Sequence, residues 1–166
     1  MTVLGVGVDA VDVERFRALL ERRPAIKTRM FTEAELDDVG GSKSGAARLA
    51  VRFAAKEATM KALGRGIGAC RFLDIEVVRS NKSGSASGAP SLRLARRAGE
   101  LARAKGVDEW HVSLTHTQLV AIAVVTAQAV ERDPGSPRIP PGRPDSGQER
   151  WARTVGERSD TGSDVE

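Results

Sequence analysis

The residues best suited to chemistry lie in one stretch, which runs from Arg52 to Gly68 and reads R-F-A-A-K-E-A-T-M-K-A-L-G-R-G-I-G. Glu57 and Lys61 stand four positions apart in its alanine-rich first part, so a helix places them on the same face. Three glycines then favour a flexible turn over further helix, namely Gly64, Gly66 and Gly68. Taken alone, Glu57 and Lys61 are also compatible with a surface ion pair of about 0.2–0.5 kcal/mol.

Two residues outside this stretch extend the pattern. Asp9 ends a β-branched run that contains Gly5 and Gly7, and His116 lies in a predicted hairpin turn. Two carboxylates from separate elements, Asp9 and Glu57, suit a hard, oxygen-binding cation such as Mg²⁺. A lysine and backbone amides nearby would complete a pyrophosphate site. Without further context, the pattern around His116 favours a turn histidine bonded to the backbone.

The hydrophobic pattern predicts the elements that must position these residues. Asp12 is a predicted helix N-cap, and Thr32 with Glu35 forms a capping box. The apolar stripe of the central helix contains Leu49, Phe53 and Met60. Helices are predicted at Val13–Arg22, Thr32–Val39, Ala46–Leu63 and Ala95–Lys105, and strands at Val3–Val8, Asp74–Arg79, Ser91–Leu94, Trp110–Leu114 and Leu119–Thr126.

Composition and charge limit the possible functions. Aromatic residues make up only 4% of the 166-residue chain, Tyr is absent and Cys70 is the only cysteine, so no disulfide can form within the chain. Six basic and eight acidic residues follow position 130, which leaves a net charge of +6 on the rest. A basic body suits a nucleic acid, a phosphorylated small molecule or an acidic protein, although ordinary solvation explains it equally well. We expect no signal peptide, no membrane partner and a cytoplasmic location.

An ordered set of short motifs resembles the bacterial holo-acyl-carrier-protein synthases, which are small 4′-phosphopantetheinyl transferases. The motifs follow the order of that family and extend to about Thr126. They are G-V-G-V-D at Gly5–Asp9, F-T-E-A-E at Phe31–Glu35, R-F-A-A-K-E-A at Arg52–Ala58, K-A-L-G at Lys61–Gly64, D-I-E-V at Asp74–Val77 and H-V-S-L-T-H-T at His111–Thr117. The resemblance implies an α+β fold, with a mainly antiparallel sheet packed around a long central helix and assembly as a homotrimer.

The resemblance also implies a reaction, in which the phosphopantetheine arm of coenzyme A moves to a serine of apo acyl carrier protein. It implies that Asp9 and Glu57 bind Mg²⁺, that Glu57 or a metal-bound water acts as base, and that Lys61 assists the leaving phosphate. Coenzyme A contacts are implied at Arg52, Lys61, Gly64, Gly66, His116 and Thr117. Arg15 is the implied contact for the carrier protein, with a solvated helix face as the alternative.

Some assignments stay open at this stage. Arg48, Arg52 and Lys56 recur along one helical edge, where phosphate contacts and structural roles are equally compatible with the pattern. His111 is interpreted as a strand residue. A transferase domain is expected at residues 1–127, followed by a Pro-rich, polar and disordered tail at 128–166.

Two other functions compete with this interpretation. A basic, non-catalytic module for RNA or an acidic protein would fit the net charge, but the body offers few aromatic residues for base stacking, so we expect no nucleic-acid partner. A different coenzyme A or nucleotide transferase could use the glycine turn. That turn is a weak indication, because it follows a helix instead of joining a strand to one.

Overall fold

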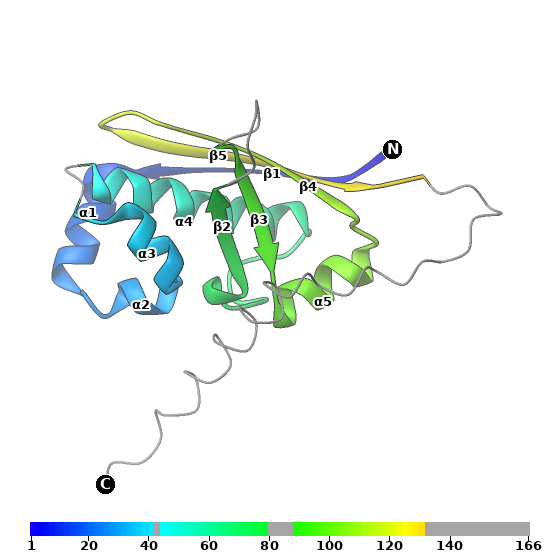
Figure 1. The fold of residues 1–166 in the computed structure, drawn as a ribbon, viewed down its shortest axis with the longest axis horizontal. Coiled ribbons are helices and arrows are strands. Elements are labelled where there is room, and N and C mark those ends of the chain that lie inside the picture. The colour runs from blue at the N-terminus through cyan, green and yellow to red at the C-terminus, as the bar shows by residue number, and fades with distance from the viewer. Residues whose placement is uncertain (42–43, 80–87, 132–166) are drawn as a thin grey trace, which may run out of the picture. The chain divides into compact units, whose positions relative to one another are not determined.

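The computed structural model describes residues 1–41, 44–79 and 88–131, and Met1–Val130 form one compact unit. The helices and strands of this unit are drawn in Figure 1. In chain order they are β1 (Thr2–Asp12), α1 (Val13–Arg22), α2 (Ile26–Met30), α3 (Glu33–Val39), α4 (Gly45–Ala62), the 3₁₀ turn η1 (Phe72–Asp74), β2 (Ile75–Arg79), β3 (Pro90–Leu94), α5 (Arg96–Lys105), β4 (Glu109–His116) and β5 (Val120–Ala129).

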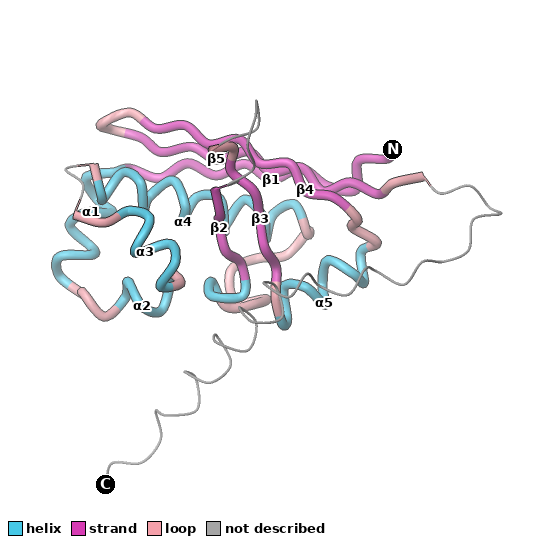
Figure 2. Tube along the Cα trace, viewed as in Figure 1, coloured by secondary structure: helices cyan, strands magenta, loops and turns pink. Residues whose placement is uncertain are grey.

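The long helix α4 is the centre of the unit, with a sheet on each side. Figure 2 shows the three-stranded sheet along one side of α4 and the β2–β3 pair crossing α4 at an angle to that sheet. The three strands are antiparallel in the order β1-β5-β4. The inner face of β5 is fully buried and consists mainly of alanine, at Ala121, Ala123 and Ala127, so helix and sheet pack closely. The predicted α+β class and antiparallel sheet around a central helix are confirmed.

Two glycines of β1 allow its backbone to lie directly on α4. A Cβ atom added at Gly5 would lie 2.0 Å from the carbonyl oxygen of Ala62, and one added at Gly7 would lie 1.8 Å from that of Ala58. No side chain fits at these distances. The group that approaches the β1 backbone at these glycines is α4, the helix that carries Glu57 and Lys61.

Local sequence signals account for most of the helix boundaries. The Asp12 carboxylate accepts a hydrogen bond from the Arg15 amide at 2.8 Å and begins α1. Thr32 and Glu35 form both hydrogen bonds of the predicted capping box at the start of α3. Gly106 ends α5 in the left-handed conformation, with φ of 77°. The predicted caps at Asp12 and Thr32 are confirmed, and so is the predicted end of the last helix at Lys105.

Several element boundaries differ from the prediction. β1 continues to Asp12, because Asp9 and Val11 stay on the inner face and keep the alternation of a strand. The five-residue helix α2 was not predicted, since so short a segment has no measurable periodicity. Residues 80–87 and nearly all of the predicted tail lie outside the described residues. Within the part of the chain that the structure describes, no helix is long and apolar enough to cross a membrane.

Among the residues that the structure describes, the outer face of the three-stranded sheet is apolar and exposed. Val6 is 57% exposed, Val8 is 51% exposed and Val124 is 39% exposed. Val8 pairs directly with Val124, and Ile122 lies two positions before Val124 in β5. These side chains therefore share one face of the sheet. Among the described residues α4 covers the inner face of β5. The apolar run Leu119–Val125 predicts that a neighbouring chain covers the outer face.

The contact between β1 and α4 predicts a steric effect of mutation. We expect Gly7→Ala to lower the free energy of unfolding by about 3 kcal/mol, the upper end of ordinary overpacking, because the methyl group meets a helix carbonyl that cannot rotate away. The matched control is Gly41→Ala, where an added Cβ meets nothing within 4 Å. Urea unfolding curves of both variants measure the difference. Equal stability of the two variants would contradict the close packing.

Candidate functional site

The contact between β1 and α4 brings three of the predicted site residues together. Asp9 is the next inward-facing residue of β1 after Gly7, and its side chain is nine-tenths buried. The Lys61 ammonium donates to Asp9 Oδ1 at 2.7 Å and to the Val8 carbonyl oxygen at 3.0 Å. Glu57 lies one helical turn before Lys61 and is half-buried. The structure therefore gathers the two carboxylates and the lysine that the sequence analysis selected.

The pKa of the Glu57 carboxyl is raised above its ordinary value. Burial is the main cause, and the negative charge of Asp9 adds to it, while Lys61 opposes the shift. A hydrogen bond to Asp9 raises the pKa further. A carboxylate with a raised pKa is a stronger base once it has lost its proton. The electrostatics of this site thus favour proton acceptance by Glu57.

Asp9 and Glu57 are ligands of the kind that a magnesium ion takes when it also binds substrate phosphates. Within residues 1–41, 44–79 and 88–131, no group of three or more His, Cys, Asp or Glu side chains is placed to hold a metal by itself. Mg²⁺ commonly takes only one or two carboxylates and completes its octahedron with water and substrate phosphate oxygens. Asp9 also accepts a hydrogen bond from a positively charged group, the Lys61 ammonium. The donor set therefore matches Mg²⁺ in the presence of a phosphate ligand.

The glycine turn follows α4 at the end nearest Lys61. Gly64 and Gly68 have φ of 71° and 96°, values that side-chain-bearing residues rarely adopt. Gly64 and Gly66 are exposed, so their backbone is accessible to a ligand. The Lys105 ammonium lies near the turn, 3.8 Å from where a Cβ of Gly64 would be. Lys105 was missed in the sequence analysis, where it appeared only as a basic residue in the last turn of a helix.

His116 and Thr117 lie at the turn between β4 and β5. Thr117 Oγ1 accepts hydrogen bonds from the Leu119 and Val120 amides, each at 3.1 Å, and so stabilises this turn. His116 pairs with Ala121 and therefore shares the inner face of the sheet with Asp9. However, β4 and β1 form opposite edges of the sheet, with β5 between them. A single chain does not bring His116 to Asp9.

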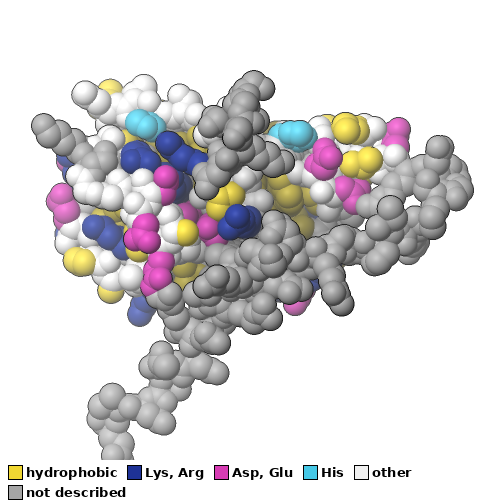
Figure 3. Space-filling model, in the orientation of Figure 1, with side chains coloured by type: hydrophobic (Ala, Val, Ile, Leu, Met, Phe, Trp, Pro, Cys, Tyr) yellow, Lys and Arg dark blue, Asp and Glu magenta, His cyan; other side chains and the backbone are white. Residues whose placement is uncertain are grey.

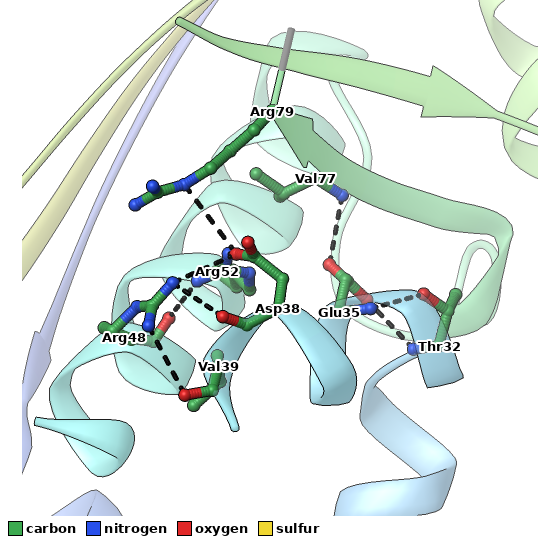
Figure 4. A network of polar contacts seen from close by, with 8 residues as sticks. All are labelled: Thr32, Glu35, Asp38, Val39, Arg48, Arg52, Val77 and Arg79. Carbon is green, nitrogen blue, oxygen red and sulfur yellow. Dashed lines mark hydrogen bonds and ion pairs between the residues drawn. The ribbon is translucent and has the colours of Figure 1, made fainter. Parts of the chain in front are cut away.

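Arg52 belongs to a second polar cluster, which joins α3, α4 and the end of β2 (Figure 4). The Oδ2 atom of Asp38 accepts from Arg48 Nη2 at 3.2 Å, lies 3.7 Å from Arg79 Nε and also forms an ion pair with Arg52. Three guanidinium groups thus face one carboxylate. Burial lowers the pKa of Arg52, and the charge of Asp38 opposes that shift. Arg79 was not selected from the sequence, where it is simply the last residue of a strand.

Lys56 and Glu35 form a fully buried ion pair beside this cluster. The Lys56 ammonium donates to Glu35 Oε2 at 2.6 Å, to the Met30 carbonyl at 2.8 Å and to the Phe72 carbonyl at 3.0 Å. Glu35 also accepts from the Thr32 and Val77 amides, both at 3.0 Å. Of the two roles left open for Lys56, the structure supports the structural one, because all three of its donors are used inside the protein.

Glu76 is a third buried charge in the same region. Its side chain points from β2 into the interior, and the residue is 1% exposed. Burial raises the pKa of Glu76 to about 7, with the nearby charge of Glu35 as the second cause, while Arg93 and Lys56 oppose the shift. Glu76 therefore carries a proton in the folded protein over a pH range in which it is ionised in the unfolded chain.

The raised pKa of Glu76 predicts a pH-dependent stability. Between about pH 4.5 and about pH 7 the folded state binds a proton that the unfolded state releases, so the free energy of unfolding decreases as the pH rises through this range. Glu76→Gln should remove that part of the decrease and be more stable than the unmutated chain at pH 8. Urea unfolding from pH 5 to 8 measures it, with Glu100→Gln on the exposed face of α5 as control. Parallel curves for the chain and Glu76→Gln would contradict this assignment.

Arg15 lies in the first turn of α1 with its side chain exposed. Its backbone amide is used by the Asp12 cap, while the guanidinium faces solvent. Its neighbours Glu14 and Arg17 are also exposed, and they lie 3.8 Å apart as an ion pair. Arg15 is therefore available to a partner protein and has no part in the core.

Comparison with known structures defines the class of protein. The chain is similar to the holo-[acyl-carrier-protein] synthase of Helicobacter pylori in complex with coenzyme A, with 30% identity, a TM-score of 0.61 and coverage of 74% of this chain and 99% of that chain. It is also similar to the holo-(acyl-carrier-protein) synthase of Bacillus anthracis in complex with coenzyme A (3′,5′-ADP), with 29% identity, a TM-score of 0.62 and coverage of 78% and 100%. The fold is that of the acyl-carrier-protein synthases.

Sequence comparison gives the family. The family model described as the 4′-phosphopantetheinyl transferase superfamily matches residues 5–125. The holo-[acyl-carrier-protein] synthase of Streptomyces coelicolor is 47% identical over 128 residues, which cover 77% of this chain and 99% of the relative. The chain belongs to the 4′-phosphopantetheinyl transferase superfamily and is a transferase.

Proposed function

We propose that the protein is a holo-acyl-carrier-protein synthase that transfers 4′-phosphopantetheine from coenzyme A to a serine of an apo acyl carrier protein. The serine oxygen forms a bond to the β-phosphorus of coenzyme A, the pyrophosphate bond breaks, and adenosine 3′,5′-bisphosphate leaves. The observation that carries this proposal is the gathering of Asp9, Glu57 and Lys61 where β1 lies on α4. Family membership supplies the reaction class.

The three site residues have distinct roles in this proposal. Glu57, which lies one helical turn from Lys61 and beside Asp9, accepts the proton of the serine hydroxyl directly or through a water. Lys61, partly exposed beside Asp9, contacts the leaving phosphate. Asp9 and Glu57 together would hold Mg²⁺, which would neutralise charge on the pyrophosphate as in other phosphoryl transfers. Alignment of the reacting groups then depends on the fixed distance between β1 and α4.

The coenzyme A contacts form two groups. The exposed backbone at Gly64 and Gly66 suits the pyrophosphate next to Lys61. The arginine cluster of Arg48, Arg52 and Arg79 has two positive charges in excess of Asp38, and we assign it to the terminal 3′-phosphate. His116 and Thr117 complete the nucleotide contacts. On the face of the molecule drawn in Figure 3, basic side chains gather beside a histidine.

We propose that the protein assembles as a homotrimer with sites shared between neighbours. Support comes from the exposed valines on the outer face of β1 and β5, which the other described residues leave uncovered. It also comes from the separation of His116 and Asp9 on opposite sheet edges. A neighbouring chain that covers the sheet can supply nucleotide contacts that the chain itself cannot reach.

The carrier protein is the second substrate in this proposal. Arg15 is exposed on α1 and suits the acidic recognition helix of an acyl carrier protein. We infer that the product, a carrier loaded with phosphopantetheine, serves fatty acid or polyketide biosynthesis. We place the reaction in the cytoplasm, in keeping with the single, buried cysteine.

The proposed reaction predicts a mass change on the carrier. Incubation with coenzyme A, Mg²⁺ and an apo carrier protein should add one phosphopantetheine group to the carrier, as seen by intact-mass spectrometry, and EDTA should stop the addition. Glu57→Gln should lower the rate at least about 100-fold, because the serine proton loses its acceptor. Glu33→Gln, on α3, is the matched control and should react normally. An unmodified carrier would contradict the proposed function. A Glu57→Gln variant with ordinary turnover would contradict the role of Glu57 as proton acceptor.

The proposed trimer predicts the effect of a charge on the outer sheet face. Ile122→Glu should break assembly and reduce transfer together, because a carboxylate cannot be desolvated there without a partner. The control is Ala104→Glu, at an exposed position of α5 that should tolerate the same charge. Light scattering and the transfer assay measure the two effects. A fully active monomer at assay concentration would contradict both the trimer and the shared site.

A further inference from the structure

Asp38 stands in an unusual electrostatic position. Its Oδ2 atom alone faces Arg48, Arg52 and Arg79, which come from two different elements. The Asp38 side chain is 37% exposed, so solvent and ligands reach it. A carboxylate that only served to neutralise the buried Arg52 would not need the two other, more exposed guanidiniums.

The position of Asp38 is set by the neighbouring buried pair. Glu35 lies one helical turn before Asp38 in α3, so both side chains point toward α4. Glu35 is locked by Lys56 and by the Thr32 and Val77 amides. Figure 4 shows Glu35 held by Thr32 and Val77 on one side of α3, with Asp38 directed at the arginines. The anchored end of α3 thus holds the Asp38 carboxylate among the guanidiniums.

We propose that Asp38 is an internal competitor for the arginine cluster, occupying it until the terminal phosphate of the nucleotide substrate displaces it. This inference rests on the proposed function and adds a selectivity step to it. The same guanidinium donors cannot make short bonds to Asp38 and to an incoming phosphate at once. A phosphate dianion carries twice the charge of a carboxylate and three terminal oxygens, so it wins this competition. A singly charged anion such as chloride does not.

Arg52 remains in place when Asp38 is displaced. Its Nη1 atom donates to the Arg48 carbonyl oxygen at 2.9 Å, independently of Asp38. Arg48 is held as well, through donation from Nη2 to the Asp38 backbone carbonyl at 2.8 Å and from Nη1 to the Val39 carbonyl at 3.3 Å. These bonds use backbone oxygens and survive replacement of the carboxylate. Arg48 and Arg52 therefore keep their orientation when the Asp38 side chain moves away or is replaced by a neutral side chain.

Asp38→Asn tests the competition directly, because the amide keeps one acceptor oxygen and removes the negative charge. Calorimetric titration should compare coenzyme A with 3′-dephospho-coenzyme A, which lacks the terminal phosphate. The variant should bind coenzyme A about 3- to 10-fold more tightly, as expected for removing one nearby charge near a protein surface. Its affinity for 3′-dephospho-coenzyme A should stay within about twofold, and the gain should shrink at high salt through screening.

Asp37→Asn is the matched control, since Asp37 is exposed, precedes Asp38 in the same helix and alters the net charge equally. It should leave both affinities within about twofold. Thermal melting checks that each variant folds, and Asp38→Ser replaces Asp38→Asn if the latter does not.

Two results would overturn the inference. A folded Asp38→Asn variant that binds coenzyme A more weakly would make Asp38 a support for the arginines. Equal gains for coenzyme A and 3′-dephospho-coenzyme A would make the effect one of general charge. Failure of the proposed function itself is separate, because it appears as an unmodified carrier in the transfer assay, whatever the two affinities are.

Discussion

The contact between two glycines of β1 and two carbonyl groups of α4 is the constraint on which the site depends. A side chain at Gly5 or Gly7 would overlap a helix carbonyl oxygen, so the strand and helix can meet at this distance only with glycine at both positions. The next inward-facing residue of the strand is Asp9, which therefore reaches Lys61 at 2.7 Å. The chemistry proposed for the protein is a consequence of this backbone packing.

The opposite side of α4 is organised by charge. Lys56 and Glu35 form a completely buried pair in which every donor of the lysine is used, and this pair ties α3, η1 and β2 to the helix. One turn further along α3, the partly exposed carboxylate of Asp38 contacts three arginines. Helix α4 thus carries the proposed reaction site where it contacts β1 and the proposed phosphate-binding arginines where it contacts α3. The buried ion pair of Glu35 and Lys56 limits how far the end of α3 that carries Asp38 can move.

The sequence predicted those parts of the fold and site that follow from local pattern. The caps at Asp12, Thr32 and Gly106 and the shared face of Glu57 and Lys61 depend on residues a few positions apart. Arg79 and Lys105 could not be selected in this way. Arg79 reaches Asp38 only through the packing of β2, and Lys105 reaches the turn at Gly64 only through the packing of α5. The role of Lys56 was equally undetermined, since a lysine becomes structural only when the fold buries it against a carboxylate more than twenty positions away.

The central claim is that Asp9 and Glu57 form one divalent-cation site because β1 lies against α4. The most direct test is titration of Mn²⁺, as a paramagnetic substitute for Mg²⁺, into the protein with coenzyme A present, following the free ion by electron paramagnetic resonance. The account predicts saturable binding by the unmutated chain and loss of most of that binding in both Asp9→Asn and Glu57→Gln. Undiminished binding in either variant would contradict it.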